Sequence, residues 1–196
     1  MKKINSNEIT PCHKHLSVAI TITDNIIKGV NLGKKLSSKT NVEFYMGKVL
    51  KLGESCTKEH QCPGLEEGDY IMFSQFAGVV APTKDEYVKV ISGHEVVAIS
   101  KQEDMNINTI IPANDRVLIE ILDENTEVNG VKIEESLDPR DKQTQKGKVI
   151  RLGIKAEGDI KEGDIVFIDP YDGNLIINDP DLKLKTIIYS EILFKI

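Results

Sequence analysis

The chain has 196 residues, 40% hydrophobic and 29% charged, which suffices for one ordinary domain or two small compact ones. Its net charge of −6 is unevenly divided: residues 1–100 carry 12 Lys against 11 Asp or Glu, and the rest carry 13 Lys or Arg against 20 Asp or Glu. Neither half has the clustered positive charge that phosphate binding needs, which argues against nucleic acid as a partner.

The start of the chain and its cysteines set expectations about location. Residues 1–6 are basic but are not followed by an apolar segment of signal-peptide length. No apolar run approaches the length that spans a bilayer. The chain has three cysteines, which cannot all pair with one another, so we expect reduced thiols in a reducing compartment. We therefore expect a cytosolic protein without a membrane partner.

Short strands joined by turns are expected along the first half of the chain. Residues 16–22 are rich in β-branched side chains, and residues 47–52 alternate between polar and apolar ones. The Gly-Asp pair at 68–69 precedes the apolar run 70–73, as a turn precedes a strand. Helical periodicity is not sustained anywhere. This pattern is typical of a small β-barrel or sandwich.

The second half repeats this order of elements. The segment GKVLKLG at 47–53 recurs as GKVIRLG at 147–153. Three further matches follow in the same order with nearly constant offset: Pro11 and Gly29 with Pro112 and Gly130, 65–73 with 160–168, and 95–99 with 191–195. Such a set indicates a duplication. The sequence predicts an all-β chain of two tandem small barrels, over 1–100 and 107–196, with a polar linker at 101–106.

Each copy carries a long polar segment between its first two strands, at 23–41 and 123–146. Each segment contains an apolar island after a glycine: Gly29-Val30-Asn31-Leu32 in the first and Gly130-Val131-Lys132-Ile133 in the second. The islands could belong to flexible loops that dock weakly and reversibly into a groove on a partner. Alternatively, they could pair as short edge strands within the barrels. The length of the segments favours docking loops.

The ordered motifs resemble those of the GroES family of co-chaperonins. In the second copy, Pro112-Ala-Asn-Asp-Arg-Val resembles the family's opening Pro-x-x-Asp-Arg-Val, and Tyr189-Ser-Glu-Ile-Leu resembles its terminal Glu-Ser-Asp-Ile-Leu. In the first copy, Phe73-Ser-Gln-Phe-Ala-Gly resembles the family's Tyr-Ser-Lys-Tyr-Ala-Gly. The first copy is more diverged, with Lys14-His15 where the family has Asp-Arg. The resemblance implies two GroES-like barrels.

The resemblance also implies a function, a partner and a site. It implies a homo-oligomeric ring that caps a GroEL-type chaperonin, with ATP bound by the chaperonin, and no cofactor or catalysis in this chain. One docking tripeptide would be Val30, Asn31 and Leu32 and the other Val131, Lys132 and Ile133, with Gly29 and Gly130 as hinges. The expected location is the cytoplasm of a bacterium or phage-infected host, with the plastid stroma as the alternative.

Two indications about the layout of such a ring conflict. The short linker favours two copies placed as neighbours in one ring. The unequal charges of the halves favour copies in distinct layers. The segment Gly53–Gly68, where the family has a roof hairpin, is longer than its equivalent Gly153–Gly163, and this difference also favours distinct layers. A closed ring of seven chains would match a seven-fold partner and engage every loop at once, which also favours distinct layers. We therefore expect seven chains in two layers.

The remaining candidates for chemistry lie in the first copy. Cys56, His60 and Cys62 could bind zinc, the two thiols could form a disulfide in an oxidising setting, or both could be free. Their spacing matches no standard zinc pattern, which favours free thiols. Two rival functions follow: a structural or assembly protein of the viral scaffold or decoration type that reuses the barrel, and a metalloenzyme built on the first copy. An apolar island in both loops argues against the structural protein.

Overall fold

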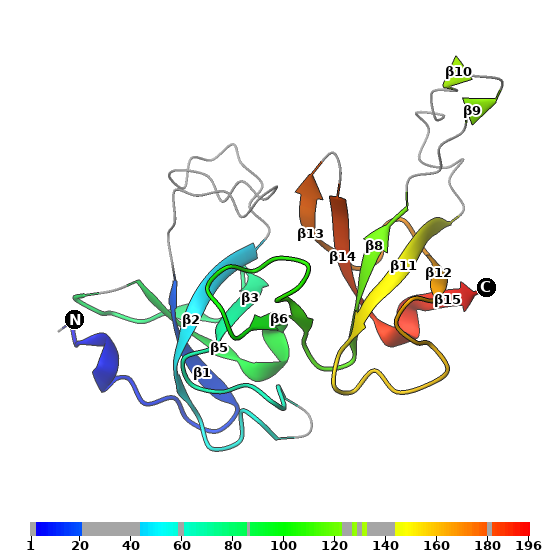
Figure 1. Ribbon diagram of the computed structural model, residues 1–196. Coiled ribbons are helices and arrows are strands. Elements are labelled where there is room, and N and C mark those ends of the chain that lie inside the picture. The colour runs from blue at the N-terminus through cyan, green and yellow to red at the C-terminus, as the bar shows by residue number, and fades with distance from the viewer. Residues whose placement is uncertain are drawn as a thin grey trace.

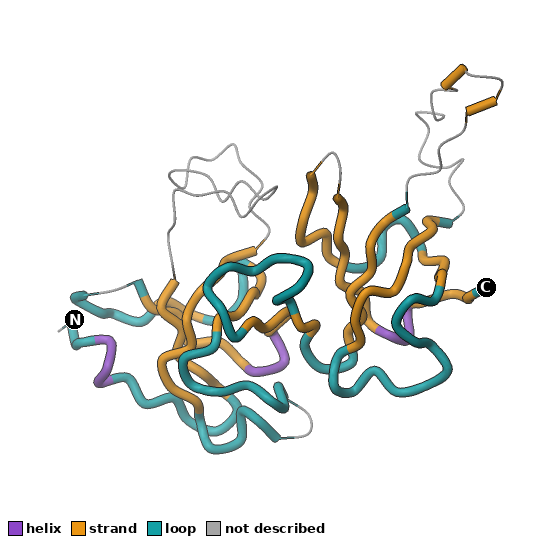
Figure 2. The backbone as a smooth tube through the Cα atoms, in the orientation of Figure 1, coloured by secondary structure: helices purple, strands orange, loops and turns teal. Residues whose placement is uncertain are grey.

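The computed structural model describes residues 3–20, 44–58, 61–85, 87–122, 127–128, 131–132, 144–179 and 182–196. Strands dominate, and the helical turns are short 3₁₀ turns at Ser6–Glu8, Gly93–Glu95 and Tyr189–Glu191. Most strands gather in two antiparallel sheets, each formed largely by one half of the chain (Figure 1, Figure 2), which confirms the predicted all-β fold. Within these residues, no helix is long and apolar enough to cross a membrane.

The first sheet has seven strands in the order β4-β5-β1-β2-β3-β6-β7. We call β1 to β6, with the residues that they enclose, the first barrel. The strands are β1 (His15–Ile20), β2 (Phe44–Leu52), β3 (Tyr70–Ser74), β4 (Val79–Val80), β5 (Val88–Ser92), β6 (Val96–Ser100) and β7 (Ile111–Pro112).

The second sheet has six strands in the order β13-β14-β8-β11-β12-β15 and forms the second barrel. Its strands are β8 (Arg116–Ile121), β11 (Gln145–Leu152), β12 (Ile165–Ile168), β13 (Asn174–Asp179), β14 (Leu182–Ile188) and β15 (Ile192–Lys195). A separate two-stranded sheet joins β9 (Glu127–Val128) to β10 (Val131–Lys132).

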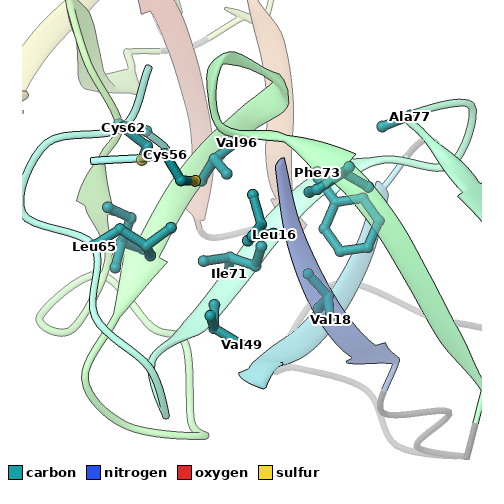
Figure 3. Packing of buried hydrophobic residues seen from close by; sticks show 13 residues of the cluster. Leu16, Val18, Val49, Cys56, Cys62, Leu65, Ile71, Phe73, Ala77 and Val96 are labelled. Carbon is teal, nitrogen blue, oxygen red and sulfur yellow. The ribbon is translucent and has the colours of Figure 1, made fainter. Parts of the chain in front are cut away.

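Each barrel encloses its own apolar core. Inward-facing side chains alternate along the strands, as Leu16 and Val18 do on β1, because successive strand residues point to opposite faces. In the first barrel these residues surround Phe73 (Figure 3). Among the buried residues described in this cluster, Phe73 is the one aromatic residue. Branched aliphatic residues fill the second core: Val117, Ile119, Ile121, Val149, Val166, Ile168 and Ile187.

The duplication extends to details of the backbone. The pairing of β1 with β2 shifts register beside Lys51, and that of β8 with β11 shifts beside Arg151, so both barrels carry a bulge at the same place. His13 and Asn114 both adopt a positive φ, of 54° and 58°. The Gly53 N–H donates to His15 O and the Gly153 N–H to Arg116 O, both at 2.8 Å. Strands and turns were therefore kept while the connecting segments changed in length.

Both barrels also bury an equivalent lysine. Lys89 on β5 donates to the carbonyl of Gln75 at 2.7 Å, and Lys185 on β14 donates to the carbonyl of Pro170 at 2.7 Å. Both side chains are buried, and burial lowers the pKa of each amine. In each case the accepting carbonyl lies in the turn between the third and fourth strands of the barrel, so the lysine ties that turn to the sheet.

The two sheets meet farther along the chain than the expected linker at 101–106. β7 belongs to the second copy by sequence, yet it pairs with β6 of the first barrel, placing Ile99 opposite Ile111 and Ala98 opposite Pro112. The Ala113 N–H also donates to the carbonyl of Val97 at 3.0 Å. The expected linker 101–106 therefore separates the sequence repeats, whereas the two sheets meet after β7.

An apolar cluster, here called the junction, joins the two barrels. Met105 from the expected linker and Ile110 are both fully buried in it, so the connecting segment is part of the packed structure. The first barrel contributes Phe44, Met46, Met72, Val97 and Ala98, and the second contributes Leu118, Ile176, Ile177 and Leu184. The barrels thus pack side by side, with β13 and β14 turned toward the first barrel (Figure 1).

Candidate partner-binding face

The two long segments leave the barrels from the same face of the molecule. β1 and β8 end, and β2 and β11 begin, on one side of the pair of barrels, the upper side in Figure 1. The described parts of Gly53–Gly68 and Gly153–Gly163 lie on the opposite side, at the bottom of the view. Side-by-side packing at the junction therefore gives both barrels one common orientation, and the attachment points of both segments share one face.

The structure describes only part of the predicted docking residues. Val131 and Lys132 form β10, which pairs with β9 through Val131 opposite Val128 and Lys132 opposite Glu127. This small sheet is separate from the six-stranded sheet and stands apart from it in Figure 1. Val131 and Lys132 thus pair locally, without joining the barrel sheet. The other predicted residues lie outside the described residues: Gly29, Val30, Asn31, Leu32, Gly130 and Ile133.

On the opposite face, the segment after Gly53 closes the end of the first barrel. Cys56 and Cys62 are fully buried in the first core, together with Leu65, and lie beside Val96 (Figure 3). The backbone folds back on itself there, because the Cys62 N–H donates to the carbonyl of Cys56 at 3.0 Å. Residues 53–58 and 61–69 form turns and contain no strand, so the described part of this segment is not a projecting hairpin.

The cysteines are free thiols in this structure. Cys12 is exposed, whereas Cys56 and Cys62 are buried. Burial raises the pKa of the Cys56 thiol to about 11 and that of the Cys62 thiol to about 12, so both stay protonated at neutral pH. The described residues contain no group of three or more His, Cys, Asp or Glu placed to hold a metal ion, and His60 lies outside them.

The sequence motifs did not point to the surfaces at the two outer ends of the molecule. Leu193, Phe194 and Ile196 are exposed on and after β15, and Val79 and Val80 are exposed on β4. A shallow groove of about 340 Å³ runs beside β4, lined by Ile9, Thr10, Pro11, Val79 and Val90. The sequence signal that the motifs left unused, the apolar run 110–112 before Asp-Arg-Val, marks β7 between the barrels and not these outer surfaces.

Geometry and one comparison with a known family bear on the class of protein. The chain is a pair of small antiparallel barrels with equivalent turns, bulges and core positions, each interrupted by a long segment whose attachment points lie on one common face. Residues 109–196, the second copy, match the model of the chaperonin 10 Kd subunit family. This match supports a GroES-family protein and does not extend to the first copy. No curated protein matches the chain.

Proposed function

We propose that this protein is a co-chaperonin that caps a GroEL-type chaperonin ring and assists ATP-dependent folding. The observation that carries the proposal is the common face from which both long segments leave the two barrels. A capping protein must present all its docking segments to one partner surface at once. The match of residues 109–196 to the chaperonin 10 Kd subunit family supports the same function.

The docking elements in this proposal are Val30 with Leu32 and Val131 with Ile133. Outer residues of an extended tripeptide point the same way, so each pair presents two apolar side chains despite the polar Asn31 or Lys132 between them. One such contact is weak, because ordering a loop on binding costs conformational entropy. Several loops on one oligomer reach high effective concentration, so they bind together more tightly than any one alone.

The proposal assigns no catalysis and no cofactor to this chain. The chaperonin binds and hydrolyses ATP, and the capping protein alters the rate of that hydrolysis by binding. We place this activity in the cytoplasm of a bacterium or phage-infected host.

The test combines the purified protein with a GroEL-type chaperonin and ATP. We expect the protein to inhibit chaperonin ATPase and to restore folding of a client that needs the closed cage. Val131→Ser with Ile133→Ser, and separately Val30→Ser with Leu32→Ser, should weaken chaperonin binding about tenfold or more, since burying each branched side chain contributes about 1.5–3 kcal/mol.

A matched control is available within each tripeptide. Lys132→Ser and Asn31→Ser change the polar central residue, which points away from the groove in an extended segment, so binding should change little. A parent protein that neither binds the chaperonin nor changes its ATPase would contradict the proposed function. Equal effects of the outer and central substitutions would contradict the assignment of the docking residues.

A further inference from the structure

The two barrels fill one end of their cores in different ways. In each barrel a short 3₁₀ turn precedes the last core strand, Gly93–Glu95 before β6 and Tyr189–Glu191 before β15. At the offset of 96, Gly93 is the equivalent of Tyr189. The Tyr189 ring packs against the core of the second barrel, and its hydroxyl accepts a hydrogen bond from the Ile160 N–H at 3.1 Å. The first barrel has no side chain at the same position.

Two cysteines occupy the space that this glycine leaves. A Cβ atom added to Gly93 would lie 3.0 Å from the carbonyl oxygen of Cys56 and 3.1 Å from its Sγ atom, so the segment leaves no room for a side chain there. Cys56 and Cys62 are fully buried and lie next to each other beside Val96 (Figure 3). The longer segment after Gly53 thus brings a pair of thiols to the place where the second barrel has a tyrosine.

The backbone holds the two cysteines within bridging distance. The Cys62 N–H donates to the carbonyl of Cys56 at 3.0 Å. Residues joined by one such hydrogen bond have Cα atoms roughly 5–7 Å apart. A disulfide joins cysteines whose Cα atoms are about 4.4–6.8 Å apart. Burial is the main cause that raises the pKa of the Cys62 thiol, and Cys56 raises it further, as expected for neighbouring sulfur atoms.

The cysteine segment can open without disturbing the barrel sheet. Residues 53–58 and 61–69 lie in no strand. The backbone N–H groups of Cys56, Cys62 and Leu65 all donate to carbonyls within the segment. A unit held in this way can open locally at a lower free energy than the whole chain unfolds. Opening exposes the thiols to solvent and removes the burial that keeps them protonated.

We propose that Cys56 and Cys62 form a reversible disulfide site, oxidised by a small-molecule disulfide such as oxidised glutathione. One cysteine thiolate attacks a sulfur atom of the small disulfide and displaces one thiol. The other cysteine thiolate then attacks the mixed disulfide, closes the bond between Cys56 and Cys62 and displaces the second thiol. The pair loses two electrons and two protons, and the small disulfide takes them up to become two thiols.

The bond acts as a clamp on one end of the first barrel, because it joins the two residues whose separation opens the segment. In a reducing compartment the pair stays a dithiol, and the bond forms as the share of oxidised small thiols rises. The cysteines lie on the face opposite the attachment points of the long segments (Figure 1). The proposal therefore needs no chaperonin, and its failure would leave the capping activity to be tested separately.

The first test asks whether the bond forms in the folded protein. Cys12→Ser removes the exposed thiol and gives the reference protein. After incubation with oxidised glutathione, we expect the reference protein to lose the mass of two hydrogen atoms and its peptide map to link Cys56 to Cys62. The matched control adds Cys62→Ala and can take up at most one glutathione. A reference protein that stays reduced, or that carries glutathione without an internal link, would overturn the proposal.

The urea dependence of the oxidation rate tests local opening. The segment exposes less surface on opening than the whole chain does on unfolding. The logarithm of the oxidation rate of the reference protein should therefore rise less steeply with urea than the logarithm of its unfolding equilibrium constant. Equal slopes would mean that only unfolded chains are oxidised, which contradicts an opening confined to this segment.

The stability of the oxidised protein tests the clamp. A disulfide that closes a short loop restricts the unfolded chain, so the oxidised reference protein should unfold about 5–10 °C above the reduced one. Dithiothreitol should return it to the lower temperature. The control with Cys62→Ala should show no rise after the same treatment. An oxidised reference protein that unfolds at or below the temperature of the reduced one would show that the bond does not clamp the barrel.

Discussion

Close backbone contacts at single glycines hold the start of each barrel in place. A Cβ atom added to Gly153 would overlap the carbonyl oxygen of Asn114 and lie 2.8 Å from that of Arg116. Gly53 meets the carbonyl oxygens of His13 and His15 in the same way. Gly53 follows β2 and lies against the turn before β1, and Gly153 follows β11 and lies against the turn before β8. At both positions only glycine leaves room for this close approach.

We expect Gly153→Ala to destabilise the protein by about 1–3 kcal/mol, because backbone atoms must move to accommodate the methyl group. Thermal unfolding followed by circular dichroism measures the effect. The control is Glu157→Ala, an exposed change in the same segment, which should stay within about 0.5 kcal/mol of the parent. Equal stability of the two variants would show that the turn is not as tightly packed as the structure has it.

The thiols should differ in reactivity. Cys12 is exposed, whereas Cys56 and Cys62 are buried with pKa values raised by burial to about 11 and about 12. Because the thiolate is the reactive form, an Ellman reagent at pH 8 should modify one thiol rapidly in the native protein and all three after denaturation. Cys12→Ser should abolish the rapid phase. Rapid modification of three native thiols would contradict the burial of the segment after Gly53.

Among the elements, the longer strands could be predicted from the sequence, whereas the short strand and the connecting segment between the barrels could not. Alternation at 47–52 and the Gly-Asp pair at 68–69 correctly predicted β2 and β3, because local burial sets these patterns. β7 was not predicted, because two residues carry no periodicity and its partner lies in the other copy. Met105 was placed in a polar linker, since a single apolar residue among polar ones gives no local sign of burial.

The candidate site could be predicted only in part for a similar reason. The apolar islands are visible in the sequence because each follows a glycine within a long polar segment. That the attachment points of both segments share one face depends on how the barrels pack, and this is set by the junction. Patterns within one copy carry no information about such packing.

The turns held by Lys89 and Lys185 should make stability depend on pH at the alkaline end. Burial is the main cause that lowers the folded-state pKa of Lys185, and Asp172 and Asp169 partly offset it. Between this lowered value and the unfolded value of about 10.4, the unfolded chain binds more protons, so stability rises with pH there. Below the folded-state pKa the cost of burying the charge is fully present.

Lys185→Met should remove this rise. The free energy of unfolding of the parent, relative to the variant, should therefore increase from pH 7 to about pH 10, as measured by urea denaturation at each pH. The control is Lys58→Met, an exposed lysine whose removal should leave the difference flat. A relative stability of parent and Lys185→Met that falls with pH would contradict the direction of the shift.

In the whole molecule, the junction should make the two barrels depend on each other. Met105 is fully buried between them, so Met105→Ala should cost about 2–5 kcal/mol. Because both barrels contact the junction, hydrogen exchange should lose protection at β6 and at β8 together. Leu16→Ala, in the first core, is the comparison and should act mainly on the first barrel. Loss confined to one barrel in Met105→Ala would mean that the barrels fold independently.

The pairing of β6 with β7 also bears on how the protein responds to dilution. Contacts between separate chains weaken as protein concentration falls, but a contact between segments of one chain does not. In any assembly of this protein, the contact between the two barrels of one chain lies within that chain. Dilution therefore separates chains from one another but releases barrels in pairs. A cell that makes few copies of this protein still has each pair of barrels in place.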